Sequence, residues 1–349
     1  MNGTFARTAC GLALLLGVGV LTEGQAVRAA AVAGVLTGSP NTWDPSQAYD
    51  RSSSAGVLAW TVYRHGIPRA VLRIGAQPVV RLNRRGQAWA WSLDAGTTTA
   101  AYQQVRHGNS DLKLYDWTTG TRTSPGGTVN TSRWEYEPAV SGHWLVFGRL
   151  NRARTPDLRR ILLDNLQTGT LVELARFEGS GQTGTLSSPH ISGDWVTWTA
   201  MGHGYQRSIV HRYRISTGQD ERIPQPDGWF DYLSTIGPDG TVYFLRSLGG
   251  CGHRVTFESY TTGGVLTALG SMPAGRDGGD EMSAAPQPDG IVDLYFDSYR
   301  CTQSPPNGNI DVLRLSLGAV VERLAGAVAV TGDQPKHIPA WLRTMEAIR

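Results

Sequence analysis

The pattern of hydrophobic and polar positions repeats about six times between residues 49 and 324. Each copy has an extended apolar segment, a polar loop, a second apolar segment, a turn that ends in glycine, and a short third segment. The glycines mark the period best: Gly75, Gly120, Gly169, Gly218, Gly263 and Gly318. They are 45, 49, 49, 45 and 55 residues apart. A period of this length, built from strands and turns, predicts an all-β protein, a six-bladed β-propeller of four-stranded antiparallel blades.

The turns between paired strands support this prediction. Pro-Asp-Gly occurs at residues 238–240 and 288–290, and Ser-Gly at 141–142 and 192–193. Proline fixes φ, aspartate bonds its own backbone and glycine takes positive φ, so these segments predict hairpins. A proline, such a turn, an aromatic strand and an apolar strand ending in Thr-Gly resemble the TolB-like six-bladed propeller repeat. That resemblance implies a fold and no particular activity.

The N-terminal segment predicts export. Arg7 precedes an apolar run over residues 11–21, and Ala31-Val32-Ala33 offers the small residues that a signal peptidase reads. We predict a signal peptide over residues 1–33, a loose lead-in over 34–48 and a single propeller domain over 49–345. An uncleaved membrane anchor is the alternative; after cleavage we expect no transmembrane span. The predicted location is secreted or extracytoplasmic, in the cell envelope. Residues 336–341 are expected to complete the first blade.

Charge and cysteine content narrow the class of partner. The net charge is +3 and only 17% of residues are charged, with the arginines scattered among acids. Since nucleic-acid binding needs a basic patch or stripe, we expect no nucleic-acid partner. Cys251 and Cys301 lie in equivalent loops of adjacent repeats, which predicts a disulfide bond; two free thiols are the alternative.

The sequence contains few signs of catalysis. Residues 34–349 have no Gly-x-Ser-x-Gly, His-Glu-x-x-His, Cys-x-x-Cys or Walker motif, so no catalytic residue is predicted. The glycines of residues 179–184 have dinucleotide-loop spacing, but a strand rather than a helix is expected to follow. Asp94 is best explained as a turn residue. Trp60, Trp144, Trp195 and Trp198 are expected to pack between blades.

The loops that lead into the innermost strands carry aromatic and acidic residues, and we expect these loops to open on one face around the channel mouth. Aromatic faces with carboxylates suit a cationic peptide or a carbohydrate. The predicted ligand-binding residues are Trp134, Glu135, Tyr136, Trp229, Asp231, Tyr232, Glu281 and His337. The oxygens of Asp277, Asp280 and Glu281 make calcium the one cofactor considered.

These features favour an exported, non-catalytic binding protein whose peptide or glycan ligand docks at the channel mouth. One alternative is an extracellular hydrolase or lyase acting on polysaccharide or peptide, with Glu135, Asp231, Glu281 and His337 as candidate groups. Another is a structural cell-envelope protein that binds an envelope partner.

Overall fold

The structure is a computed structural model. It describes residues 42–49, 56–64, 67–74, 80–83, 89–96, 98–152, 156–179, 184–202, 207–249, 253–272, 282–286, 291–298, 309–316 and 319–325. Every regular element in these ranges is a β-strand, which confirms the predicted all-β class. Residues 1–33, 326–349 and both cysteines of the predicted disulfide lie outside the described part of the chain.

The strands form four-stranded antiparallel sheets in chain order, with one longer sheet. The first sheet has β1 (Thr42–Tyr49), β2 (Gly56–Arg64), β3 (Ile67–Ile74) and β4 (Val80–Arg81). The longer, eight-stranded sheet has β5 (Trp89–Ala95), β6 (Thr99–Arg106), β7 (Asn109–Asp116), β8 (Thr121–Thr123), β9 (Trp134–Ser141), β10 (Trp144–Asn151), β11 (Leu158–Asn165) and β12 (Thr170–Glu178). Its halves, β5–β8 and β9–β12, are joined by one parallel pair, Ser110 opposite Trp134.

Three further four-stranded sheets follow. The first has β13 (Gly184–Ser192), β14 (Trp195–Gly202), β15 (Arg207–Arg214) and β16 (Gln219–Arg222). The next has β17 (Phe230–Ile236), β18 (Val242–Ser247), β19 (Thr256–Tyr260) and β20 (Leu266–Ser271). The last has β21 (Met282–Pro286), β22 (Ile291–Ser298), β23 (Asn309–Ser316) and β24 (Ala319–Ala325).

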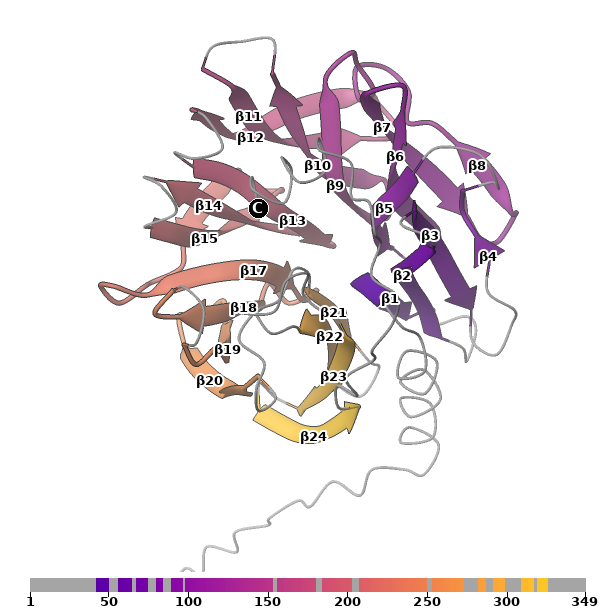
Figure 1. The fold of residues 1–349 in the computed structure, drawn as a ribbon. Coiled ribbons are helices and arrows are strands. Elements are labelled where there is room, and N and C mark those ends of the chain that lie inside the picture. The colour runs from indigo at the N-terminus through magenta and orange to yellow at the C-terminus, as the bar shows by residue number, and fades with distance from the viewer. Residues whose placement is uncertain are drawn as a thin grey trace, which may run out of the picture.

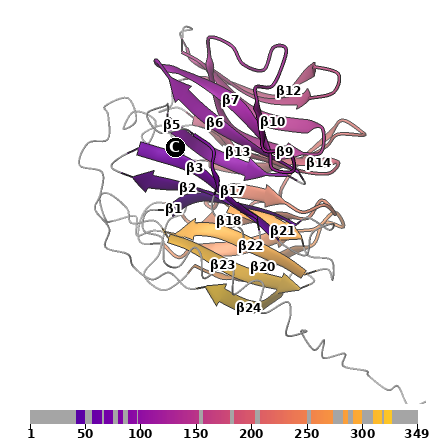
Figure 2. The ribbon, with the colours of Figure 1, turned by 90° about the vertical axis from the view of Figure 1, so that its right-hand side faces the viewer.

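These groups of strands surround a common centre, with β9, β13, β17 and β21 toward it and β12, β20 and β24 on the outside (Figure 1). Each group contacts the next through its first strand: β5 lies beside β2, β9 beside β6, β13 beside β10, and β17 beside β14. At the end of the series, β1 lies between β2 and the pair β21 and β22 (Figure 2). The first strand and the last sheet are therefore neighbours, although the whole chain separates them.

β1 includes residues 42–48, which the sequence analysis assigned to a loose lead-in. It is the first strand of its sheet and pairs with β2 over most of its length, with one register shift between Trp43 and Ser46. Residues 42–49 therefore supply the inner strand that we expected from the C-terminal tail. The tail itself lies outside the described residues.

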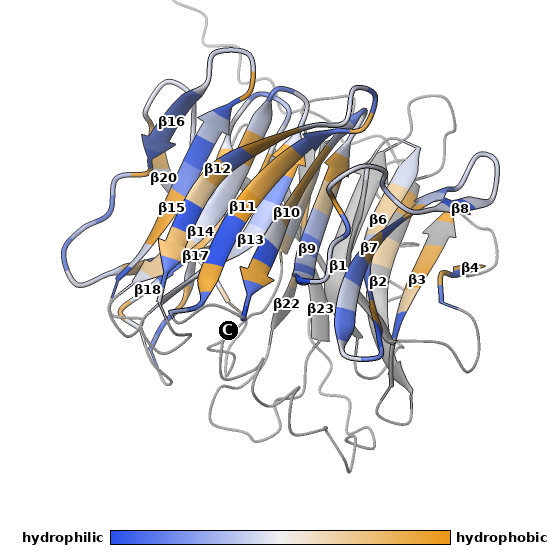
Figure 3. Ribbon diagram, turned by 90° about the horizontal axis from the view of Figure 1, so that it is seen from above, coloured by the Kyte–Doolittle hydropathy of each residue, from blue (hydrophilic) through white to orange (hydrophobic). Residues whose placement is uncertain are grey.

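Apolar side chains fill the junctions between neighbouring groups. Val146, Ile161 and Leu163 of β10 and β11 pack against Val196 and Trp198 of β14, for example. The middle strands are buried on both faces, as in β10, while the outermost β12 is largely exposed. The edge strand β16 consists of polar residues and is largely exposed (Figure 3). Trp198 is fully buried in this packing, as expected from the sequence, and Trp144 and Trp195 are half-buried against the same kind of core.

The glycine turns expected from the sequence join the strands. Gly142 and Gly193 have φ of 58° and 57° in the hairpins between β9 and β10 and between β13 and β14. Gly240 has φ of 79°, and a Cβ there would meet the Trp195 ring at 2.6 Å. This hairpin therefore needs glycine both for its conformation and for its close contact with the neighbouring sheet.

Candidate functional site

The mouth face is defined here as the end of the sheets at which the inner strands β9, β13 and β17 begin. Each of these strands has one non-glycine residue with positive φ near its middle: Glu137 at 47°, Ser188 at 49° and Leu233 at 50°. The strand register shifts at these points. The residue two positions earlier is therefore in the same structural position in all three strands: Glu135, Leu186 and Asp231.

Glu135 forms a buried ion pair across the β9–β10 hairpin. Its Oε1 accepts a hydrogen bond from Arg149 Nε at 2.9 Å, and the two residues are direct cross-strand partners. The Glu135 side chain is 0% exposed. Arg149 Nη2 also donates to the carbonyls of Thr128 and Val129, both at 2.7 Å. The pair therefore links the beginning of the inner strand β9 to the loop that precedes it.

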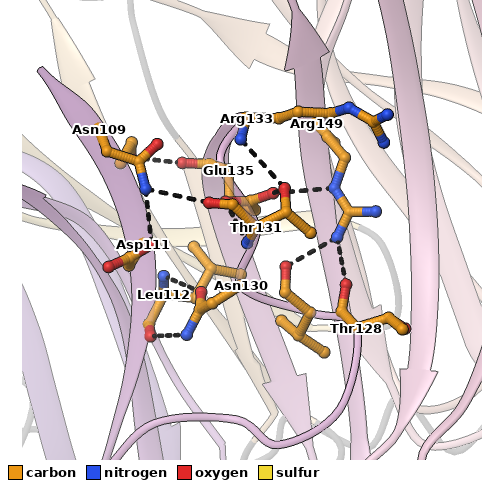
Figure 4. A network of polar contacts seen from close by, with 11 residues as sticks. Asn109, Asp111, Leu112, Thr128, Asn130, Thr131, Arg133, Glu135 and Arg149 are labelled. Atoms are coloured by element: carbon orange, nitrogen blue, oxygen red, sulfur yellow. Dashed lines mark hydrogen bonds and ion pairs between the residues drawn. The ribbon is translucent and has the colours of Figure 1, made fainter.

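Further hydrogen bonds hold this leading loop (Figure 4). Thr131 Oγ1 donates to Glu135 Oε1 at 2.7 Å. Asn130 bonds both backbone groups of Leu112 in β7, accepting from the N–H at 2.7 Å and donating to the carbonyl at 3.0 Å. Ser110 Oγ in β7 donates to the Glu135 carbonyl at 2.6 Å. The loop is thus fixed to two strand groups at once.

Asp231 repeats this arrangement at the start of β17. Arg246 of β18 donates from Nε and from Nη2 to its two carboxylate oxygens, both at 2.6 Å. Arg246 Nη2 also donates to the Pro224 carbonyl at 2.9 Å, in the preceding loop. Ser208 Oγ of β15 donates to the Asp231 carbonyl at 2.7 Å, as Ser110 does at the other pair.

Burial dominates the electrostatics of both pairs. Loss of water raises the pKa of the Glu135 carboxyl above its ordinary value, against the lowering effects of Thr131 and Arg149. Burial likewise raises the pKa of Asp231, against the effect of Arg246. Removing the charges from water costs free energy that the partner must offset. Loss of either arginine would therefore destabilise the folded protein strongly.

Leu186, the equivalent residue of β13, forms a different junction. Its cross-strand partner is Ala200, so neither an acid nor an arginine occupies the ion-pair positions. The Leu186 carbonyl accepts a hydrogen bond from the Tyr136 hydroxyl at 2.7 Å. Arg159 of β11 lies at the same junction, only 2% exposed, and donates from Nη1 to Thr185 Oγ1 at 3.0 Å.

The structure places the predicted ligand-binding residues in three environments. Glu135 and Asp231 are fully buried with arginine partners, and Trp134 and Tyr136 are buried in the protein interior. Trp229 and Tyr232 are half-buried at the start of β17 and leave part of each side chain accessible. Glu281 and His337 lie outside the described residues, as do Asp277, Asp280, Cys251 and Cys301. In the described ranges, no three acidic, histidine or cysteine side chains cluster as they would around a metal ion.

Sequence reasoning missed the arginines of this face: Arg149, Arg159 and Arg246. A signal was present, because each acid is followed by its arginine 14 or 15 residues later in the same hairpin. Arg159 has no such partner in sequence. Within the described segments, no helix is long and apolar enough to cross a membrane.

No protein-family model matches the chain, and no curated protein matches its sequence. Solved structures do match. TolB from Acinetobacter baumannii gives a TM-score of 0.50 at 15% identity, over 76% of this chain and 65% of that chain. An oligogalacturonate lyase in complex with manganese gives 0.52 at 12% identity, over 82% and 86%. A prolyl endopeptidase gives 0.52 at 13% identity, over 86% and 44%.

This chain therefore spans less than two thirds of the TolB chain and less than half of the prolyl endopeptidase chain. At such low identity, the likeness concerns the fold and leaves the activity open. The repeated four-stranded sheets around a centre and the match to TolB agree with the repeat pattern found in the sequence. The chain has a TolB-like β-propeller fold.

Proposed function

We propose that this chain is an exported, non-catalytic binding protein that captures a peptide or glycan on its mouth face. In this proposal, β5–β8 and β9–β12 are separate blades of a six-bladed propeller, because a single parallel pair joins them. Residues 1–33 are removed on export, and the mature protein acts in the cell envelope or outside it. A disulfide between Cys251 and Cys301 and calcium at Asp277, Asp280 and Glu281 belong to the same proposal.

The pair of buried ion bridges carries this proposal. Glu135–Arg149 and Asp231–Arg246 fix two leading loops to the sheets behind them. Loops fixed before a ligand arrives lose little conformational entropy on binding, so they suit recognition. Both oxygens of Asp231 and one oxygen of Glu135 are bonded to arginine. Engaged carboxylates of this kind favour a binding scaffold over glycoside hydrolysis, which needs two free, convergent carboxylates.

Trp229 and Tyr232 are the best-placed contact residues. Trp229 ends the leading loop, where its N–H donates to the Pro226 carbonyl at 3.2 Å, and Tyr232 follows Asp231 in β17. Half-buried aromatic side chains on a rigid base supply stacking area at a low entropic cost. Glu281 and His337 remain proposed contacts. Trp134 and Tyr136 support the face from within.

A glycan and peptide array tests the proposal, probed with purified residues 34–349 with and without calcium. For any captured ligand, we expect Trp229→Ala to weaken binding at least about tenfold while the melting temperature changes little. Trp144→Ala is the matched control, since Trp144 is also half-buried but begins β10 opposite Ser141, at the end of the inner strand that lies away from the mouth face. An array without ligands, or equal losses in both variants, would refute binding at this face. Turnover of an arrayed compound would favour the enzymatic alternative.

A further inference from the structure

Arg159 occupies a position that serine fills at the neighbouring junctions. It is the second residue of β11, as Ser110 is of β7 and Ser208 of β15. Both serines donate to a carbonyl of the following inner strand. The corresponding carbonyl at this junction belongs to Leu186 and already accepts the Tyr136 hydroxyl. Arg159 is therefore not needed to satisfy the inner strand.

The guanidinium of Arg159 is buried but only partly bonded. Its Nη1 donates to Thr185 Oγ1 at 3.0 Å, and the residue is 2% exposed. Its Nε and Nη2 have no hydrogen-bond partner among the residues that the structure describes. Arg159 forms no ion pair within the described ranges, and a buried arginine that has lost its hydration without gaining a counterion is costly to the folded state.

The unpaired edge is the one that other arginines of this protein use for carboxylates. Arg246 holds both oxygens of Asp231 through Nε and Nη2, at 2.6 Å each. Nε and Nη2 form two parallel donors, whose spacing matches the two oxygens of a carboxylate. At the junction of Arg159, the residue equivalent to Asp231 is Leu186, so the inner strand supplies no acid there.

A second arginine adds positive charge beside the first. Arg152 directly follows β10, and its guanidinium lies 5.3 Å from the centre of the Trp134 ring. Burial and the charge of Arg159 both lower the pKa of Arg152, while Asp157 acts in the opposite direction. The two guanidinium groups therefore act on the same region of the mouth face, between β9–β12 and β13–β16.

We propose that Arg159, supported by Arg152, binds a carboxylate group of a peptide ligand through its Nε and Nη2 donors. The carboxylate is an Asp or Glu side chain or a free C-terminus, since a peptide carries either on a narrow, flexible arm. A uronic acid carries its carboxylate directly on a sugar ring, which an open aromatic face would have to hold. Phe177, the cross-strand partner of Arg159, is half-buried and packed against the core of this junction. Trp134 is buried beneath Arg152, and Tyr136 is buried with its hydroxyl bonded.

This inference rests on the proposed function, because it places a peptide on the same face. It is tested by titrating residues 34–349 with galacturonic acid and with three synthetic peptides: Ac-AAEAA-NH2, Ac-AAQAA-NH2 and Ac-AAAAA-OH. The readout is the NMR signal of the Arg159 Nε–H group together with the dissociation constants. We expect the glutamate peptide or the free C-terminus to bind at least about tenfold more tightly than the glutamine peptide, because a charge-assisted pair replaces a neutral contact.

Two variants separate ligand binding from a structural role. In Arg159→Met, the preference for carboxylate should vanish, and the melting temperature without ligand should stay equal or rise, since an unpaired buried charge is removed. Arg159→Lys keeps the charge without the fork and should lose most of the preference. A melting temperature of Arg159→Met that falls as far as that of Arg246→Met would make Arg159 a structural brace and overturn the proposal.

The remaining outcomes of these experiments each test the carboxylate assignment or the proposed function. Equal binding of the three peptides, a preference that survives in Arg159→Met, or tighter binding of galacturonic acid would each overturn the peptide-carboxylate assignment. If the array finds ligands that need no carboxylate, this inference fails and the proposed function stands. If the array finds none, the proposed function fails, and the shift of the Arg159 signal still decides whether the carboxylate site exists.

Discussion

Two kinds of junction meet at the mouth face of this propeller. At the starts of β9 and β17, a buried acid is paired with an arginine of the adjacent strand, and a serine from the preceding group caps the inner strand. At the start of β13, leucine and alanine occupy the ion-pair positions, and an arginine occupies the serine position. The backbone is alike in all three, down to the residue with positive φ.

The two kinds of junction differ in the partner of the buried arginine. In the first kind of junction, each arginine has a carboxylate of the protein, so the pair braces a loop. In the second, Leu186 and Ala200 replace the acid and its arginine, and a different arginine, Arg159, occupies the position that serine has at the other two junctions. Arg159 forms no such pair with a described residue, so its Nε and Nη2 donors are left for an outside partner. Substitutions can test this contrast directly.

The largest expected effect follows from removing Arg246. In Arg246→Met, the carboxylate of Asp231 stays fully buried without its ionic partner. We expect a loss of about 3–5 kcal/mol in the free energy of unfolding, as for other buried pairs that lose one member. Arg149→Met should behave similarly, whereas Arg159→Met should not. Urea unfolding of the three variants measures the difference.

A double variant provides the control for this prediction. Asp231→Leu with Arg246→Met reproduces the apolar pairing of Leu186 and Ala200, and it should recover most of the lost stability. Loss of equal size in the single and double variants would show that packing, and not an uncompensated charge, explains the effect of Arg246→Met.

The repeat pattern predicted the all-β fold because the turns between strands need glycine at particular positions, and these glycines can be recognised in the sequence. Glycine at 120, 169 and 218 has φ of 71°, 70° and 69°, as turns between the last strands of each group require. The hairpins at Gly142, Gly193 and Gly240 were predictable for the same reason. The number of blades and their closure depend on contacts between distant segments, such as β1 beside β21, which no local pattern reports.

The site was less predictable, for a physical reason. Glu135 and Asp231 were assigned to ligand binding because we expected them in loops that open around the channel mouth, whereas both lie in strands. The register shift at Glu137 and Leu233 determines which residue of the next strand faces each acid, and sequence periodicity does not reveal such a bulge. Without the register, the arginine 14 or 15 residues later could not be recognised as a partner.

A smaller effect should follow from crowding the junction of Arg159. Gly148 lies opposite Tyr136, and a Cβ at Gly148 would lie 2.3 Å from the tyrosine ring. In Gly148→Ala, the ring must move and its hydroxyl must leave the Leu186 carbonyl, which should cost about 1–3 kcal/mol of stability. Gly202→Ala in β14 is the matched control, because a Cβ there meets nothing within 4 Å. Equal melting temperatures of the two variants would contradict the predicted crowding.

The smallest effects concern the caps of the inner strands. Ser110→Ala, Ser208→Ala and Tyr136→Phe each remove one buried hydroxyl that donates to an inner-strand carbonyl, at 2.6, 2.7 and 2.7 Å. We expect each to cost about 0.5–1.5 kcal/mol, the usual net value of such a bond. Similar losses, measured by thermal unfolding, would show that Tyr136 takes over the role of serine at this junction. A negligible loss for Tyr136→Phe alone would mean that Arg159 can turn to cap Leu186, and its donors would then no longer be free for a ligand.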